Sequence, residues 1–166
     1  MPYPYTPYHI GPSCLLGLLL RRWVDIPVFV LSNFVIDLAV LVAGFCRPIS
    51  FVQEYIHTVL IGALIGMLWG TAAHFFFKDL FRRTMLKIRL PYRADIRKKI
   101  FSGVIGTWVH VFIDFLYKPD IRLFWPTSLM NPSFQFHRRA ISFVLFLSFF
   151  AAVFLYVIIS NRGKKR

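Results

Sequence analysis

The chain has 166 residues, of which 57% are hydrophobic, 18% aromatic and 16% charged, and its net charge is +13. With a mean hydropathy of +0.61, it carries more apolar surface than a soluble domain of this length can bury, which excludes an ordinary soluble fold. The positive charges lie between and after the apolar runs, so they indicate membrane orientation and contact with anionic head groups, and no nucleic-acid partner is expected.

The apolar segments predict an all-α fold, an integral membrane helical bundle that forms a single domain over residues 1–166. A span needs about 20 mostly apolar residues, and four segments meet or approach that length: 26–45, 57–77, 100–117 and 141–160. These are the four long transmembrane helices that we expect. Ahead of them, residues 10–20 are apolar but short, so we expect a re-entrant or interfacial helix, or a short fifth span, with Pro12 in its first turn.

Lys and Arg are distributed unequally between the loops. Nine fall in residues 78–99, four lie in the tail 161–166 and two form the pair Arg21–Arg22, whereas the opposite loops hold five. By the positive-inside rule, the basic linker 78–99 and the C-terminus are cytoplasmic, and the loop 118–140 lies outside. We therefore expect a multi-pass protein of the inner (cytoplasmic) membrane, with the lipid bilayer as a partner.

Several ionisable residues lie within the apolar segments, where each costs about 2.5–3.5 kcal/mol on insertion scales and so indicates a function. Gly103, Thr107, His110 and Asp114 recur at intervals of four, three and four, which places small and polar side chains on one narrow stripe of a helix. The spacing of His110 and Asp114 allows both to bind one metal ion. Alternatively, the carboxylate holds the imidazole in one tautomer.

Further candidates come from the other segments. Asp37, four residues after an asparagine, lies roughly 15 Å from the inner end of its segment at about 1.5 Å per residue, a depth similar to that of His110. His57 opens the second span, ahead of a GxxxGxxxG packing face over residues 62–70. His9 precedes the short N-terminal helix. The alternative for these side chains is a structural hydrogen-bond network that joins the helices.

Four stretches of the chain, TPYHIGPSCLLGLLL, SNFVIDLAV, EYIHTVLIGALIG and TWVHVFIDFLYKPDIRLFWPTS, resemble the ordered blocks of a family of small membrane proteins. These are the LexA-binding, inner-membrane-associated hydrolases, also described as membrane-bound metal-dependent hydrolases. The resemblance covers most of the chain to about Asn131, and its most specific block contains His110, Asp114 and the sequence WPTS. It implies a divalent metal, with zinc the first expectation. The ligands that it implies are His9, Asp37, His57, His110 and Asp114.

The chain departs from the family pattern at two positions. Gln53 stands four residues before His57, where related members tend to have a histidine, and Ala39 stands where a second acid often follows the family aspartate by two. Both differences remove potential ligands. They argue against a complete two-metal or three-metal site and leave a mononuclear one.

The leading hypothesis is a metal-dependent hydrolase that acts on an ester or phosphoester, with its site open to the non-cytoplasmic side. Imidazole and carboxylate ligands suit zinc or a similar ion, which lowers the pKa of a coordinated water. We expect a ligand core of His57, His110 and Asp114, completed by His9 or Asp37. Asp37 and Asp114 are the candidate catalytic carboxylates, because the one that is not a ligand is free to act as general base.

Candidate substrate-binding residues lie in the outer loop. Lys118, Arg138 and Arg139 are candidates for holding a phosphate in the outer loop, and a lipid substrate would suit a site that is reached sideways from the bilayer. The competing hypothesis is a non-catalytic membrane module for partner binding or assembly. A proton- or ion-conducting carrier is disfavoured, because the chain is short and lacks paired broken helices.

Overall fold

The structure, a computed structural model, describes residues 7–93, 95–116, 118, 120–127 and 138–163. The regular structure within these residues is entirely α-helical, as predicted. The six helices of the described part are α1 (Pro7–Leu19), α2 (Ile26–Gly44), α3 (Ile49–Ile56), α4 (Val59–Lys87), α5 (Ile96–Phe115) and α6 (Arg138–Gly163).

Within the described ranges, three helices are long and apolar enough to cross a membrane: α2, α4 and the part of α6 from Arg139 to Asn161. The fourth predicted long span corresponds to α5, whose 20 residues cover about 30 Å at 1.5 Å per residue. α5 is not among the helices apolar enough to cross, so the expected count of four long spans is not confirmed. The 13 residues of α1 cover only about 20 Å, less than the hydrocarbon thickness of about 30 Å.

Polar residues just ahead of the apolar runs determine where the helices start. The Asp25 side chain accepts a hydrogen bond from the backbone N–H of Val28, and a proline follows in the first turn of α2. Thr58 caps α4 through the N–H of Ile61, and Asp95 caps α5 through two backbone N–H groups. Each cap satisfies donors that a helix start leaves unpaired, so these boundaries follow from local sequence.

Several boundaries differ from the predictions. α4 continues to Lys87, so the first half of the predicted linker 78–99 is helical, and only the segment around Leu90–Pro91 separates α4 from α5. Pro12 lies inside α1 rather than in its first turn, because the helix already begins at Pro7. The short helix α3 was not predicted, and it places His57 between two helices instead of at the start of one.

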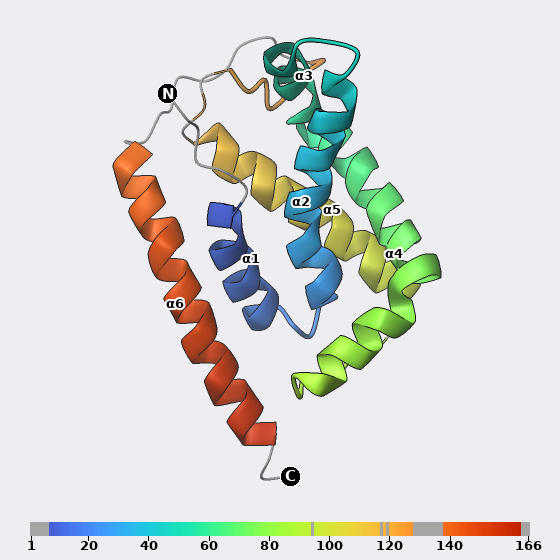
Figure 1. Cartoon of the computed structure of the whole chain (residues 1–166), viewed down its shortest axis with the longest axis vertical. Coiled ribbons are helices and arrows are strands. Elements are labelled where there is room, and N and C mark those ends of the chain that lie inside the picture. Colours follow the sequence, from blue (N-terminus) through green and yellow to red (C-terminus); the bar gives the residue numbers. More distant parts are fainter. Residues whose placement is uncertain (1–6, 94, 117, 119, 128–137, 164–166) are drawn as a thin grey trace.

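The helices form a bundle with α5 near its middle (Figure 1). α4 and α2 pack against α5, while α1 lies between α2 and α6 and provides most of the contact that holds α6. Glycines set the closest approach. A Cβ added to Gly66 would lie 2.6 Å from the carbonyl carbon of Gly103, and the Thr107 hydroxyl donates to the Gly62 carbonyl at 2.8 Å. The predicted glycine face of α4 and the small, polar stripe of α5 therefore meet.

The basic segments gather at one end of the bundle. The Lys98 ammonium donates to the carbonyl of Arg21 at 3.2 Å, and the Tyr156 hydroxyl of α6 donates to the carbonyl of Ile88 at 3.2 Å. We call this the basic end. The opposite end carries α3 and the connection after α5, which are joined where the backbone N–H of Val59 donates to the carbonyl of Leu123 at 3.0 Å. This grouping agrees with an even number of crossings between the basic segments.

Candidate metal centre

Five ionisable side chains, from α1, α2, α5 and the break between α3 and α4, meet near the end of the bundle that carries α3. They form two overlapping sets, one of His9, His110 and Asp114 and one of Asp37, His57 and His110, and the ligand atoms within each set lie within 4.8 Å of one another. α1 contributes His9 from its first turn, α2 contributes Asp37, and α5 contributes His110 and Asp114. The depth count predicted that Asp37 lies near His110, and the structure brings His9 and His57 into the same cluster.

The position of His57 depends on the break between α3 and α4. α3 ends at Ile56, and the His57 backbone N–H still donates to the carbonyl of Gln53 at 3.1 Å. The next residue, Thr58, has extended backbone angles and caps α4. His57 is fully buried, so the chain break directs its imidazole between the helices. This explains how a residue near a helix start reaches the interior of the bundle.

Three of the donor atoms form a nearly equilateral triangle. The Nε2 atoms of His57 and His110 lie 3.3 Å apart, and the Asp37 Oδ1 lies 3.5 Å from the first and 3.3 Å from the second. Ligands held at about 2.0–2.1 Å around a tetrahedral zinc ion lie roughly 3.3 Å from one another. The triangle therefore has the dimensions of one face of a tetrahedral coordination shell.

Asp114 joins this triangle to two further groups. Its Oδ2 lies 3.3 Å from Nε2 of His57 and 3.5 Å from Nε2 of His110, while its Oδ1 lies 3.1 Å from Nε2 of His9. The Lys118 ammonium also donates to Oδ2 at 2.5 Å. Asp114 thus lies between the imidazoles and a cation, and a metal ion would compete with that cation for Oδ2.

The centre is closed on most sides. His57, His110 and Asp114 are fully buried and His9 is 1% exposed, whereas the side chain of Asp37 is 30% exposed. The His9 and His110 rings stack with centroids 4.3 Å apart. Both rings make polar contacts within the centre through their Nε2 atoms. Their Nδ1 atoms have no hydrogen-bond partner within the described part of the chain.

The outer-loop cations proposed from the sequence have different surroundings. Lys118, expected to lie in the loop, is 7% exposed and contacts Asp114, so it belongs to the centre itself. Arg139 is exposed at the start of α6. The side chain of Arg138 lies outside the described residues. A lysine four residues after Asp114 on a helical register is the signal that would have placed Lys118 correctly.

A second buried polar cluster, which the sequence analysis missed, lies at the basic end. The Lys99 ammonium is 3.1 Å from Oδ2 of Asp25, and both side chains are fully buried. It also donates to the Tyr92 hydroxyl at 2.5 Å and lies 5.0 Å from the centroid of the Phe81 ring. Burial, and then the nearby Asp25 carboxylate, raise the pKa of the Tyr92 hydroxyl, so it stays protonated.

Lys99 was counted with the basic residues of the linker 78–99, whereas the structure buries its side chain in the first turn of α5. The sequence did contain a signal for this buried ion pair: Asp25 and Lys99 carry opposite charges, and each stands at the basic end of an apolar segment. Asn33 also has a structural role, because its amide donates to the Ser13 hydroxyl at 2.8 Å and joins α2 to α1.

Comparison of the chain with protein-family models, curated proteins and solved structures finds no match. The function is therefore inferred from the side chains of the centre.

Proposed function

We propose that this protein is a membrane-bound metal-dependent hydrolase that cleaves an ester or phosphoester. The triangle of Asp37, His57 and His110 carries the proposal, because its three separations of 3.3–3.5 Å match those of ligands around one small divalent ion. Imidazole and carboxylate donors suit zinc. The resemblance of the sequence blocks around these residues to a hydrolase family supports the same interpretation.

The distances favour a ligand set that differs from the core expected from sequence. Asp114 was placed in that core, but its Oδ2 already accepts from the Lys118 ammonium. The Oδ1 of Asp37 lies within 3.5 Å of both imidazoles, and the side chain is 30% exposed, which provides access for an ion. We assign His57, His110 and Asp37 as the ligands of a single ion, with Asp114 and His9 beside it. A divalent ion held there would polarise the scissile group and lower the pKa of a bound water.

The remaining groups supply the other parts of a hydrolytic reaction. The water oxygen forms a bond to the carbonyl carbon or phosphorus, the bond to the leaving alcohol oxygen breaks, and the proton lost by water ends on that alcohol. Asp114, paired with His9 at 3.1 Å, is placed to accept this proton and return it. The Lys118 ammonium, beside Asp114, is placed to hold a negatively charged substrate oxygen.

The proposal includes an orientation in the membrane. α2, α4 and α6 span it, α5 forms the fourth long span, and α1 covers part of the depth because it is too short to cross. The basic end is cytoplasmic by the positive-inside rule. The metal centre, which lies toward the opposite end, then opens to the non-cytoplasmic side of the inner membrane.

Replacing His110 with alanine tests the proposal most directly. We expect purified wild-type protein loaded with zinc to retain about one ion per chain, and His110→Ala to retain close to none. His74→Ala is the matched control, because His74 lies on α4 outside the cluster. Metal content is measured by mass spectrometry. Hydrolysis of aryl ester and bis-aryl phosphoester substrates is expected in wild type and His74→Ala, and is expected to be lost in His110→Ala and after chelation.

The second candidate function is a structural module for assembly, favoured by the contacts that Asp114 already makes with His9 and Lys118. It predicts a wild-type protein that binds no zinc at any ratio and that unfolds more readily when His110 is replaced. Zinc-free, inactive but well-folded wild-type protein would exclude the hydrolase and leave this alternative.

A further inference from the structure

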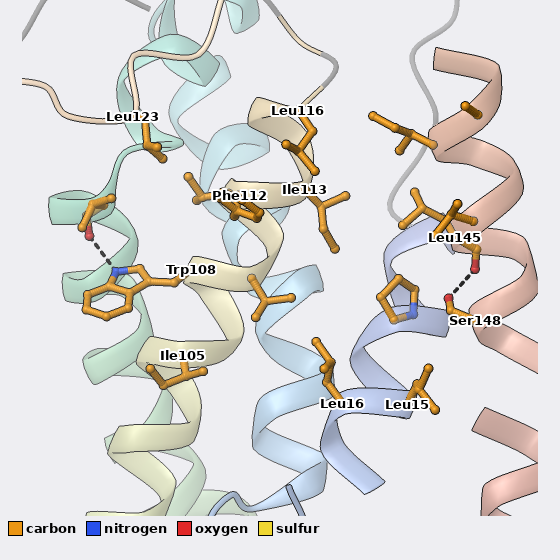
Figure 2. A pocket seen from close by; sticks show the side chains of 17 residues that line it. Leu15, Leu16, Ile105, Trp108, Phe112, Ile113, Leu116, Leu123, Leu145 and Ser148 are labelled. Atoms are coloured by element: carbon orange, nitrogen blue, oxygen red, sulfur yellow. Dashed lines mark hydrogen bonds between the residues drawn. The ribbon is translucent and has the colours of Figure 1, made fainter. Parts of the chain in front are cut away.

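A large apolar groove lies between α1, α5 and α6. Its cavity volume is about 850 Å³, and its lining includes Pro12 and Leu16 of α1, Phe112 and Ile113 of α5, and Leu145 of α6. Figure 2 shows the side chains of α5 on one side of this space and those of α6 on the other, with α1 between them. The groove exists because α6 packs mainly on α1 and leaves the flank of α5 uncovered.

The groove offers nothing to a polar ligand. Its two polar lining side chains already donate to backbone carbonyls, Trp108 to Val59 at 2.9 Å and Ser148 to Leu145 at 2.5 Å. The rest of the lining is aliphatic or aromatic. Because α6 is one of the membrane-spanning helices, the medium at this depth is hydrocarbon, so an acyl chain fills the groove without a desolvation cost.

The groove and the metal centre lie on neighbouring flanks of the same helices. Ile113 lines the groove and the next residue, Asp114, belongs to the centre; Val111 likewise follows His110. Successive residues on a helix differ by about 100° in direction. An occupant of the groove therefore lies beside the ionisable cluster rather than within it.

Two cationic residues are close in sequence to residues that line the mouth of the groove at the α3 end. Leu116 and Leu123 line the groove there, and between them in sequence lies Lys118, whose ammonium contacts Asp114. Arg139, exposed at the start of α6, directly precedes the groove-lining Ala140. An anionic head group at this mouth would find two cations, one of them in direct contact with the metal centre.

We propose that the groove binds an acyl chain of a membrane glycerophospholipid and holds its head group at the mouth beside Lys118, so that this lipid class is the substrate. The inference rests on the proposed hydrolase function and specifies its substrate class. The bond cleaved is an ester or phosphoester near the glycerol, and water supplies the oxygen and the proton for the two products.

The test uses wild-type protein in phosphatidylcholine vesicles doped with phosphatidylglycerol that carries a photoactivatable diazirine in one acyl chain. We expect cross-links to be several-fold more frequent at groove residues such as Leu15 and Phe112 than at exposed apolar residues of α4 such as Phe75 and Phe76. Equal labelling of both sets would show only contact with bulk lipid and would overturn the proposal.

Two variants of α6 test the groove itself. Val144→Trp places a large ring in the groove, whereas Val153→Trp makes the same change at an exposed residue of the same helix outside the groove. Val144→Trp is expected to reduce groove labelling several-fold and to raise KM for long-chain phosphatidylglycerol. Neither labelling nor KM is expected to change in Val153→Trp, and KM for a soluble short-chain analogue is expected to stay constant in both.

The two proposals fail in different ways. α6 contributes none of the candidate ligands, so zinc content is expected to be the same in both variants. Zinc bound without selective labelling would refute the lipid groove and leave the hydrolase. Selective labelling of a protein that binds no zinc would refute the hydrolase, and with it the assignment of this lipid as substrate.

Discussion

Lys99 and Asp25 place two full charges inside the bundle. Water is excluded from both side chains, so the pair depends on its mutual attraction, on the Tyr92 hydroxyl and on the face of the Phe81 ring. The Asp25 carboxylate also caps α2. The backbone N–H of Asp25 donates to the Ser102 hydroxyl of α5 at 2.6 Å. One residue therefore connects the start of α2 with the start of α5.

We expect Lys99→Met to destabilise the protein by about 3–5 kcal/mol, because it leaves the Asp25 carboxylate buried without a counter-charge. Lys98→Met is the control, since Lys98 is half-buried and donates to the backbone carbonyl of Arg21. Unfolding of both variants is followed in detergent micelles by circular dichroism. The double variant Asp25→Asn, Lys99→Met keeps a capping side chain and should recover much of the loss; equal stability of the two single variants would contradict this account.

At the scale of whole elements, the α4–α5 contact fixes the metal centre. His110 and Asp114 lie on the same stripe of α5 as Gly103, about two to three turns farther along the helix. Gly66 of α4 and Gly103 meet backbone to backbone, and this contact fixes the rotation of α5 that directs the two side chains into the centre. Such close approach allows van der Waals contact along the helices, which is the main source of helix association in a membrane. An added side chain in this contact would separate the helices and shift α5.

Gly103→Ala is expected to reduce stability by about 1–3 kcal/mol, the usual cost of overpacking, because its Cβ would overlap the Gly66 carbonyl. Gly62→Ala is the matched control on the other helix of the same contact. Its added Cβ would meet its nearest neighbour at an ordinary 3.6 Å. Thermal unfolding in detergent, together with zinc retention, compares the two. If Gly103→Ala were as stable as Gly62→Ala, the close backbone contact could not be what holds α5.

For the molecule as a whole, the charge distribution and the packing point to one orientation. The basic segments share one end, and the exposed Cys46 follows α2 at the other. The positive-inside rule assigns the basic end to the cytoplasm. The native cysteine is therefore a reporter for the opposite side.

We expect a membrane-impermeant maleimide to label Cys46 in right-side-out vesicles and not in sealed inside-out vesicles. Cys46→Ser abolishes this labelling, because the remaining Cys14 is partly buried in α1. Adding Arg93→Cys to the Cys46→Ser variant places a reporter at the basic end, and its labelling should show the reverse pattern. Labelling of both positions from the same face would reject the assigned topology.

The sequence alone predicted an all-helical protein with helices apolar enough to cross a membrane, and it singled out the five ionisable residues that the structure brings together. These features are local or periodic: hydrophobic runs, and polar residues repeated at helical spacing on α5. Even so, the sequence placed Pro12 one turn too early in its helix, missed α3, and counted Lys99 with the basic linker, because nothing local distinguishes a buried lysine from a solvated one.

Only the tertiary structure decided which atoms meet. In the structure, Asp37 lies within 3.5 Å of the imidazoles of His57 and His110. Lys118 contacts Asp114 instead of lying free in the loop, and Lys99 pairs with Asp25. An apolar groove also lies beside α6. Each of these results depends on the rotation and separation of whole helices, which glycine contacts and long-range packing set. Sequence spacing gives the face of one helix, but the neighbour that this face meets is determined by the bundle as a whole.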